Sequence, residues 1–157
     1  MPIILALDAS SHDIGFTLAE DERYILSGQW SPKGDEDTRM TATVQWVDDM
    51  ITRYEVGILA IEEPAVVRNG KVDRLLARVC GHCEAVIRLR DGQVILIHPS
   101  TVKRTGFSKD KLEAATRLTP KQQVGGHEAD SLGVWQAALC EIQELNLRER
   151  EMSSAYC

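Results

Sequence analysis

The sequence predicts an α/β domain built on a five-stranded mixed sheet that is flanked by helices. The chain opens with three short strand-like segments separated by polar turns, which is typical of an antiparallel meander. Helical and strand-like segments then alternate, which is typical of strands that join a sheet in parallel. The length of 157 residues and the hydrophobic content of 43% are those of one domain with a proper core.

The strands are predicted from apolar runs that end at turn-forming residues. The first run, residues 2–8, is apolar up to its final acid, which indicates a strand buried on both faces. Polar turns at residues 10–13 and 21–22 separate it from the next two strands. In chain order, the five predicted strands cover residues 2–8, 14–19, 24–30, 57–61 and 94–97.

The helices are predicted from apolar residues at helical spacing. In the first of them, Met40, Val44, Val47 and Ile51 recur on one face. The predicted helices cover residues 38–54, 71–90, 101–104, 108–118 and 127–145. Because residues 146–157 lose this periodicity, we expect one domain over residues 1–145 and a flexible C-terminal tail over residues 146–157.

Hydropathy and cysteine usage predict a cytoplasmic protein. No apolar run approaches the roughly 18 residues that a membrane helix needs, and no signal sequence follows Met1. The spacing of the four cysteines does not suggest a disulfide framework, which fits a reducing compartment. The C-x-x-C motif of Cys80-Gly81-His82-Cys83 lies inside a helical pattern, and no second ligand pair follows, so we interpret it as helix packing.

The charge distribution is more informative than the formal net charge of −6. Residues 66–126 hold 12 of the 18 Lys and Arg residues, whereas both flanking regions are acidic. A cationic middle between acidic ends is expected when one surface meets phosphate and carboxylates gather elsewhere. The alternative is that these cations only solvate exposed helix faces.

Two acids end strands that share one pattern. Asp8 closes Ile4-Leu5-Ala6-Leu7-Asp8, and Glu62 closes Ile58-Leu59-Ala60-Ile61-Glu62. A carboxylate at the end of a buried strand is costly unless its charge is compensated. Neighbouring acids would also repel each other, and a divalent cation resolves that repulsion. Glu63 is a rival for Glu62, but the strand pattern favours Glu62 and leaves Glu63 to support it.

A second pair of candidate ligands opens the last predicted helix. His127 and Asp130 lie at positions i and i+3, so they share one helix face. Gly125 and Gly126 precede them, and we expect these glycines to let the helix start approach the sheet edge. The four candidate catalytic and metal-binding residues are therefore Asp8, Glu62, His127 and Asp130.

Oxygen ligands of this kind suit Mg²⁺, with Mn²⁺ as a substitute, and no small-molecule cofactor is indicated. Two such ions, about 3.5–4 Å apart, activate a water and stabilise the leaving oxygen in phosphodiester cleavage. His127 would either bind a metal ion or orient the attacking water. The pattern therefore predicts a metal-dependent hydrolase.

At these residues the chain resembles the RuvC-type Holliday junction resolvases of the ribonuclease H superfamily. Leu5-Ala6-Leu7-Asp8-Ala9-Ser10, followed by Gly15, is similar to the first-strand motif of that family. Ala60-Ile61-Glu62 is similar to the motif of its second acid. His127-Glu128-Ala129-Asp130-Ser131 resembles its terminal pair, where members carry Asp or His at the first position.

The resemblance spans roughly residues 3–140. Gly81 and the helix around it resemble the long helix that follows the second acid in that family. The basic DNA-contacting segment of the family is similar to Val102-Lys103 and Lys111, which flank Gly106. It implies a ribonuclease H-like fold and a homodimer that grips a four-way DNA junction and nicks two strands symmetrically, in DNA recombination and repair.

Eight basic residues are expected to contact DNA phosphates without reading bases. Four lie where phosphates would approach the carboxylates, namely Lys103, Arg104, Lys109 and Lys111. Of these, Lys103 or Lys111 would also offset transition-state charge. Four follow the second acid and would line the branch point of the junction, namely Arg68, Lys71, Arg74 and Arg78.

The chain departs from the family pattern at two places. Ala65 stands where such resolvases often carry an aromatic wedge, and the segment between Lys103 and Lys111 is shorter than in typical bacterial members. Both departures bear on junction and sequence preference more than on hydrolysis. A compact phage-type resolvase would show both departures. Two alternatives remain: a broader branched-DNA or RNA–DNA hybrid nuclease, and a non-catalytic DNA-binding module.

Overall fold

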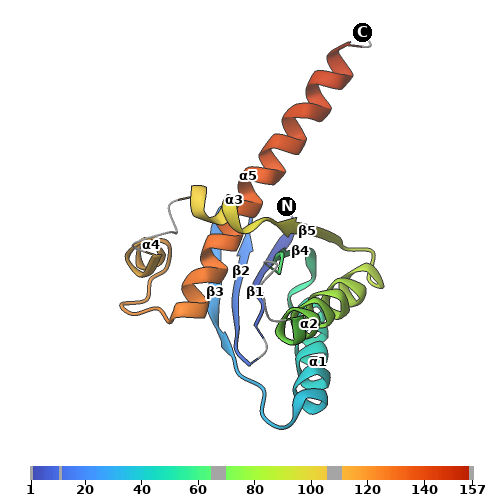
Figure 1. Ribbon diagram of the computed structural model, residues 1–157. Helices are drawn as coiled ribbons and strands as arrows, with labels where there is room; N and C mark the ends of the chain where they lie inside the picture. Colours follow the sequence, from blue (N-terminus) through green and yellow to red (C-terminus); the bar gives the residue numbers. More distant parts are fainter. Residues whose placement is uncertain (1, 11, 65–69, 106–110, 156–157) are drawn as a thin grey trace.

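The computed structural model describes residues 2–10, 12–64, 70–105 and 111–155, and it confirms the predicted α/β fold (Figure 1). Five strands form one mixed sheet in the order β3-β2-β1-β4-β5. The strands are β1 Ile3–Asp8, β2 Ile14–Glu20, β3 Arg23–Trp30, β4 Val56–Glu62 and β5 Gln93–Ile97. The helices are α1 Glu36–Tyr54, α2 Gly70–Arg88, α3 Pro99–Arg104, α4 Lys111–Leu118 and α5 Gly126–Ala155.

The direction of the strands brings three of their ends together. β1, β2 and β3 form the predicted antiparallel meander, whereas β1 pairs with β4, and β4 with β5, in parallel. Leu7 lies opposite Ile61, and Glu62 lies opposite Ile97. The carboxyl ends of β1, β4 and β5 therefore meet at one edge of the sheet, which we call the carboxyl edge.

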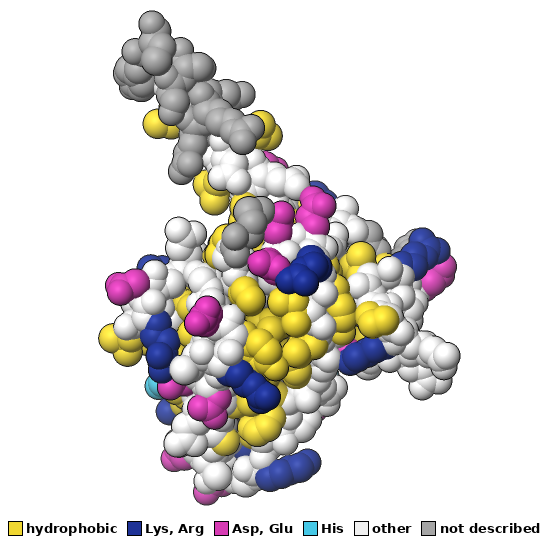
Figure 2. Space-filling view, turned by 180° about the vertical axis from the view of Figure 1, so that it is seen from behind, with side chains coloured by type: hydrophobic (Ala, Val, Ile, Leu, Met, Phe, Trp, Pro, Cys, Tyr) yellow, Lys and Arg dark blue, Asp and Glu magenta, His cyan; other side chains and the backbone are white. Residues whose placement is uncertain are grey.

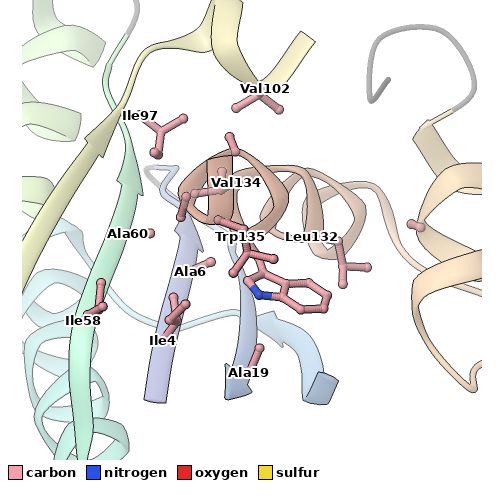
Figure 3. Close-up of a cluster of buried hydrophobic side chains, with 14 of the residues drawn as sticks. Ile4, Ala6, Ala19, Ile58, Ala60, Ile97, Val102, Leu132, Val134 and Trp135 are labelled. Carbon is pink, nitrogen blue, oxygen red and sulfur yellow. The ribbon is translucent and has the colours of Figure 1, made fainter. Parts of the chain in front are cut away.

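The two faces of the sheet carry separate hydrophobic clusters. On one face, Ala6 and Ala60 lie in a cluster with Trp135 and Leu132 of α5 (Figure 3). On the other face, Leu7 and Ile61 lie in a cluster with residues of α1 and α2. Because side chains alternate along a strand, Asp8 and Glu62 follow Ala6 and Ala60 toward the α5 face.

The start of α1 and the end of α5 differ from their predicted positions for local reasons. α1 begins at Glu36 because Asp35 caps it, with the Asp35 side chain accepting a hydrogen bond of 2.9 Å from the backbone N–H of Thr38. α5 runs on to Ala155, past the predicted end at residue 145. Across that end, the exposed ion pair of Arg148 with Glu144 joins successive turns of the helix where apolar periodicity is lost. Flexibility of residues 146–157 stays a prediction.

The distal half of α5 projects from the body of the molecule (Figure 1). Below it, hydrophobic side chains gather on the face seen in Figure 2. A groove of about 770 Å³ lies at the amino ends of the parallel strands, with Pro2, Ile4 and Ile142 among its lining residues. The groove is thus at the opposite end of the sheet from the carboxyl edge. No helix within the described residues has the length and apolar character needed to span a bilayer.

The cysteines of the C-x-x-C motif belong to the hydrophobic cluster between the sheet and α2. Both Cys80 and Cys83 are free and buried. Burial raises the pKa of the Cys80 thiol to about 11 and that of the Cys83 thiol to about 12. Both thiols therefore stay protonated at neutral pH and pack as small apolar groups, as interpreted from the sequence.

Candidate metal centre

The end of β1 meets the start of α5 through a contact between Asp8 and His127. Nδ1 of His127 lies 2.8 Å from Oδ2 of Asp8, although the two residues are 119 positions apart in the sequence. A carboxylate only accepts hydrogen bonds, so Nδ1–H of His127 donates, and in the neutral imidazole Nε2 then keeps its lone pair. The side chains of His127 and Asp8 are 40% and 17% exposed, respectively, so a ligand can reach them from solvent.

Asp130 completes a group that can hold a metal ion. One ligand atom from each of Asp8, His127 and Asp130 lies within 4.8 Å of the other two. The helical spacing of His127 and Asp130 places both on the same side of α5, as predicted. Two carboxylates and one imidazole form a donor set that fits a divalent cation, and the start of a helix also favours negative charge.

Glu62 lies beside this group but outside it. It ends β4 on the strand next to Asp8 and is half-buried. Among the described residues, the group whose ligand atoms come within 4.8 Å holds Asp8, His127 and Asp130 without Glu62. The backbone N–H of the following Glu63 donates a hydrogen bond of 2.8 Å to the carbonyl oxygen of Ile97. This bond ties the end of β4 to the end of β5 at the carboxyl edge.

The close approach of α5 to the sheet depends on Gly15, which corrects the role expected for Gly125 and Gly126. A Cβ atom on Gly15 would lie 1.7 Å from the carbonyl oxygen of His127. In contrast, a Cβ on Gly126 would meet nothing within 4 Å, and one on Gly125 would meet only the side chain of Gln29 at 3.8 Å. The glycine that the contact requires therefore lies on β2, in register with Asp8.

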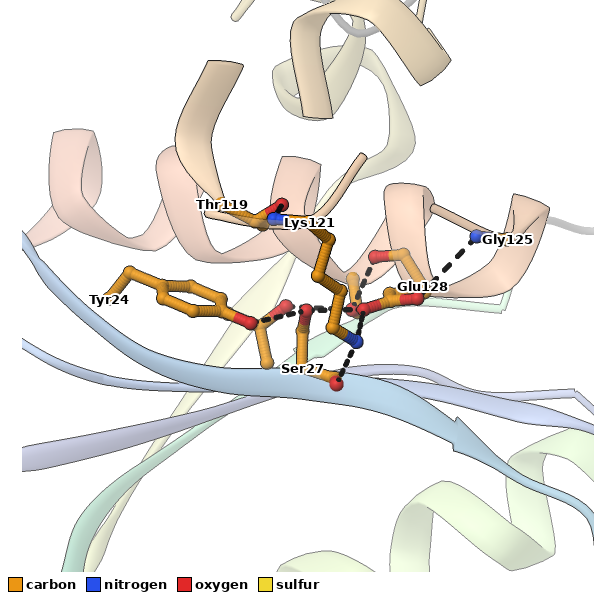
Figure 4. Close-up of polar contacts among 8 residues, drawn as sticks. Tyr24, Ser27, Thr119, Lys121, Gly125 and Glu128 are labelled. Atoms are coloured by element: carbon orange, nitrogen blue, oxygen red, sulfur yellow. Dashed lines mark hydrogen bonds and ion pairs between the residues drawn. The ribbon is translucent and has the colours of Figure 1, made fainter. Parts of the chain in front are cut away.

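Between the two candidate ligands of α5, Glu128 points into a network that the sequence analysis did not identify (Figure 4). Its carboxylate accepts hydrogen bonds from the Ser27 hydroxyl at 2.5 Å and from the Lys121 ammonium. Burial by itself would raise the pKa of Glu128, but the hydrogen bonds from Lys121 and Ser27 outweigh it, and the pKa lies below its ordinary value. Glu128 is therefore a buried, ionised and compensated acid.

Asp13 is a further acid near the site, in a segment that the sequence analysis interpreted only as a turn. Its carboxylate accepts a hydrogen bond of 2.5 Å from the Ser31 hydroxyl. This bond is the main reason that the pKa of Asp13 is lowered, and His127, when it is protonated, lowers that pKa to a smaller extent. Asp13 thus adds a negative charge near His127.

The predicted DNA-contacting residues fall into separate parts of the structure. Lys103 and Arg104 are exposed on α3, which follows the carboxyl end of β5. Arg74 and Arg78 are exposed on α2, where Arg78 pairs with Glu36 at 3.3 Å. Lys71 and Lys111 lie in the first turns of described helices, but their side chains lie outside the described part of the chain. Arg68 and Lys109 lie outside the described residues.

The sequence matches no protein-family model and no curated protein, but the fold matches known structures. The structure of T. thermophilus RuvC in complex with a Holliday junction substrate aligns with a TM-score of 0.79 at 14% identity, over 92% of this chain and 97% of that chain. The yeast mitochondrial Holliday junction resolvase Ydc2 aligns with a TM-score of 0.58 at 11% identity, over 90% of this chain and 82% of that chain.

A viral protein shows the same likeness. The fowlpox virus resolvase, in complex with its substrate Holliday junction DNA, aligns with a TM-score of 0.53 at 10% identity, over 89% of this chain and 98% of that chain. The resemblance to Holliday junction resolvases is therefore confirmed at the level of the fold, which is ribonuclease H-like.

Proposed function

We propose that this chain is a metal-dependent DNA endonuclease that resolves four-way junctions by paired nicks, in DNA recombination and repair. The observation that carries the proposal is the convergence of Asp8, His127 and Asp130 within 4.8 Å at the carboxyl edge of the sheet. This convergence occurs on a fold shared with T. thermophilus RuvC, whose structure holds a Holliday junction substrate.

The proposed ligands are Asp8, Glu62, His127 and Asp130, and the proposed ion is Mg²⁺, for which Mn²⁺ would substitute. When bound, a pair of such ions supplies water activation and charge stabilisation in phosphodiester hydrolysis. Asp8 also orients the imidazole of His127 by accepting a hydrogen bond from its Nδ1–H. This bond favours the tautomer in which Nε2 can bind a metal ion or accept a proton. Glu62 adds a carboxylate from the neighbouring strand.

The substrate would be held by positive charge near the carboxyl edge. Lys103 and Arg104 are exposed on α3, at the end of the sheet where the carboxylates lie. Contacts of this kind bind DNA phosphates and set its position without reading the base sequence. We propose further that two copies form a symmetric dimer, because paired nicks in a two-fold junction need two equivalent sites.

The proposal is tested with the purified full chain and an end-labelled synthetic four-way junction, in Mg²⁺, in Mn²⁺ and in EDTA. We expect symmetric paired nicks that require a divalent ion and a loss of rate of about 100-fold or more in Asp8→Asn and Asp130→Asn. Asp49→Asn is the matched control, because it removes an exposed carboxylate of α1. Failure to cleave the junction, or wild-type rates in Asp8→Asn, would overturn the proposal.

The same assay separates the alternatives when linear duplex, flap and RNA–DNA hybrid substrates are included. Equal rates on linear duplex and junction would contradict junction selectivity. Faster cleavage of hybrid or flap substrates would assign a broader nuclease. DNA binding without any calorimetric binding of Mg²⁺ or Mn²⁺ would assign a non-catalytic DNA-binding module.

A further inference from the structure

The buried acid Glu128 lies between the two candidate ligands of α5, and its environment is unusual for a carboxylate. The residue is only 7% exposed. Ser27 of β3 and Lys121, which precedes α5, both donate to its Oε1 atom, and the Lys121 ammonium also donates to the carbonyl oxygen of Ser27 at 2.7 Å. A charge buried at this depth is tolerated only when such partners surround it.

Hydrogen bonds extend the network over two neighbouring strands (Figure 4). The Tyr24 hydroxyl lies 3.1 Å from the Ser27 hydroxyl on β3. One turn along α5, the Ser131 hydroxyl donates to the carbonyl oxygen of Glu128 at 2.7 Å and lies 2.8 Å from the hydroxyl of Thr17 on β2. The start of α5 is therefore tied to β3 through Glu128 and to β2 through Ser131.

These contacts fix the rotation of α5 about its own axis. Successive residues of an α-helix point about 100° apart, so anchoring Glu128 sets the directions of His127 and Asp130. The contact of His127 with Asp8 ties the same turn to β1. Three adjacent strands thus hold the first two turns of α5, and a rotated helix would carry His127 and Asp130 away from Asp8.

We propose that Glu128, held by Lys121 and Ser27, is a positioning residue that aims His127 and Asp130 at Asp8. The inference rests on the proposed function, because it concerns the geometry of the same metal centre. Glu128 itself points away from that centre, toward β3. Its role is therefore to orient the ligands and not to bind the ion.

The test compares metal affinity with stability in Glu128→Gln. Glutamine keeps the shape but loses the charge that Lys121 compensates. Calorimetric titration with Mn²⁺ alone, at a temperature where the variant is fully folded, should show a dissociation constant raised by about tenfold or more, as is typical when a group that orients ligands is lost. Val47→Ala is the matched control. Val47 is a fully buried residue of α1 in the cluster on the face of the sheet opposite α5, so its truncation destabilises the protein without changing a contact of α5.

We expect Val47→Ala to lower the melting temperature but to bind Mn²⁺ within about twofold of wild type, since Val47 lies in the cluster on the other face of the sheet from α5. Ser27→Ala keeps the ion pair and removes one donor, so it should weaken Mn²⁺ binding less than Glu128→Gln does. If Glu128→Gln does not fold, Ser27→Ala decides the test: weaker Mn²⁺ binding than in the wild type supports the positioning role, and unchanged Mn²⁺ affinity overturns it.

A second readout needs no metal. Imidazole ¹⁵N shifts report the tautomer of His127, which we expect to be Nδ1–H in the wild type and a mixture in Glu128→Gln. Unchanged Mn²⁺ affinity and an unchanged tautomer in folded Glu128→Gln would overturn the positioning role alone. Failure of the wild-type protein to bind Mn²⁺ would instead overturn the proposed function.

Discussion

A Cβ atom on Gly15 would lie only 1.7 Å from the carbonyl oxygen of His127. Gly15 is also the residue opposite Asp8 in the pairing of β1 with β2. The backbone of α5 therefore rests directly on the strand beside Asp8, at a place where no other residue type fits. This close approach lets the His127 side chain reach the Asp8 carboxylate, so the geometry of the candidate metal centre depends on a glycine at residue 15.

Gly15→Ala should consequently displace the start of α5. Overpacking of a buried contact costs about 1–3 kcal/mol, and here the clashing atom belongs to the backbone and cannot rotate away. We expect a lower free energy of unfolding in urea and weaker Mn²⁺ binding by calorimetry. A variant with wild-type stability and wild-type Mn²⁺ affinity would show that the close approach does not position His127.

Gly81→Ala is the matched control for that substitution. Gly81 is exposed in the interior of α2, and a Cβ atom there would meet nothing within 4 Å. Alanine is favoured over glycine inside a helix by about 0.5–1 kcal/mol. The same change of glycine to alanine should therefore stabilise the protein at residue 81 and destabilise it at residue 15.

Much of the fold could be predicted from the sequence, because buried strands and amphipathic helices leave periodic patterns. Asp8 was identified as a candidate because it ends a continuous apolar run, and His127 and Asp130 because they open a helix at spacing i, i+3. These features depend on neighbouring residues alone. The structure brings their side chains within 4.8 Å of one another, whereas Glu62 lies outside that group among the described residues.

The parts that were missed depend on contacts between distant segments. Glu128 meets Ser27 across 101 positions, and nothing around either residue indicates the other. The role of Gly15 was likewise assigned to the glycines next to His127, since sequence proximity was the only guide. The start of α1 had a local signal, because Asp35 followed by Glu36 and Asp37 is typical of a capped helix start.

The ligand type at residue 127 should set the preference among metal ions. An imidazole suits transition metals, whereas a carboxylate suits hard ions such as Mg²⁺. We therefore expect His127→Asp to lower the ratio of the junction cleavage rate in Mn²⁺ to that in Mg²⁺. His82→Asp, a change of the same kind at an exposed position of α2, should leave the ratio unchanged. An unchanged ratio in His127→Asp would argue against His127 as a ligand.

The cap of α1 should make a pH-dependent contribution to stability. Two hydrogen bonds hold the pKa of Asp35 below its ordinary value of 3.8. The bond with the Thr38 side chain has the larger effect, and the bond from the backbone N–H of Thr38 has the smaller one. A group whose pKa falls on folding stabilises the protein above its unfolded pKa and loses that effect as pH falls through the folded pKa. The contribution is therefore complete at neutral pH and disappears in acid.

Asp35→Ala should thus lower the melting temperature at pH 7, and the difference from wild type should shrink below about pH 4. Thermal unfolding followed by circular dichroism at several pH values measures this difference. Gln45→Ala, an uncharged change at an exposed position of the same helix, should give a difference that does not vary with pH. A constant difference for Asp35→Ala would show that its carboxylate does not cap α1.

Lys103 on α3 should bind a DNA phosphate, and salt dependence distinguishes that role from a solvated surface charge. Each neutralised phosphate contributes about 0.9 to the slope of the logarithm of the association constant against the logarithm of salt concentration. In an Asp8→Asn background that prevents cleavage, Lys103→Ala should weaken binding to a four-way junction and reduce the slope by about that amount. Arg148→Ala removes one exposed cation from the C-terminal part of α5 and should leave the slope unchanged. Equal slopes in Lys103→Ala and its parent would mean that DNA does not approach the carboxyl edge along α3.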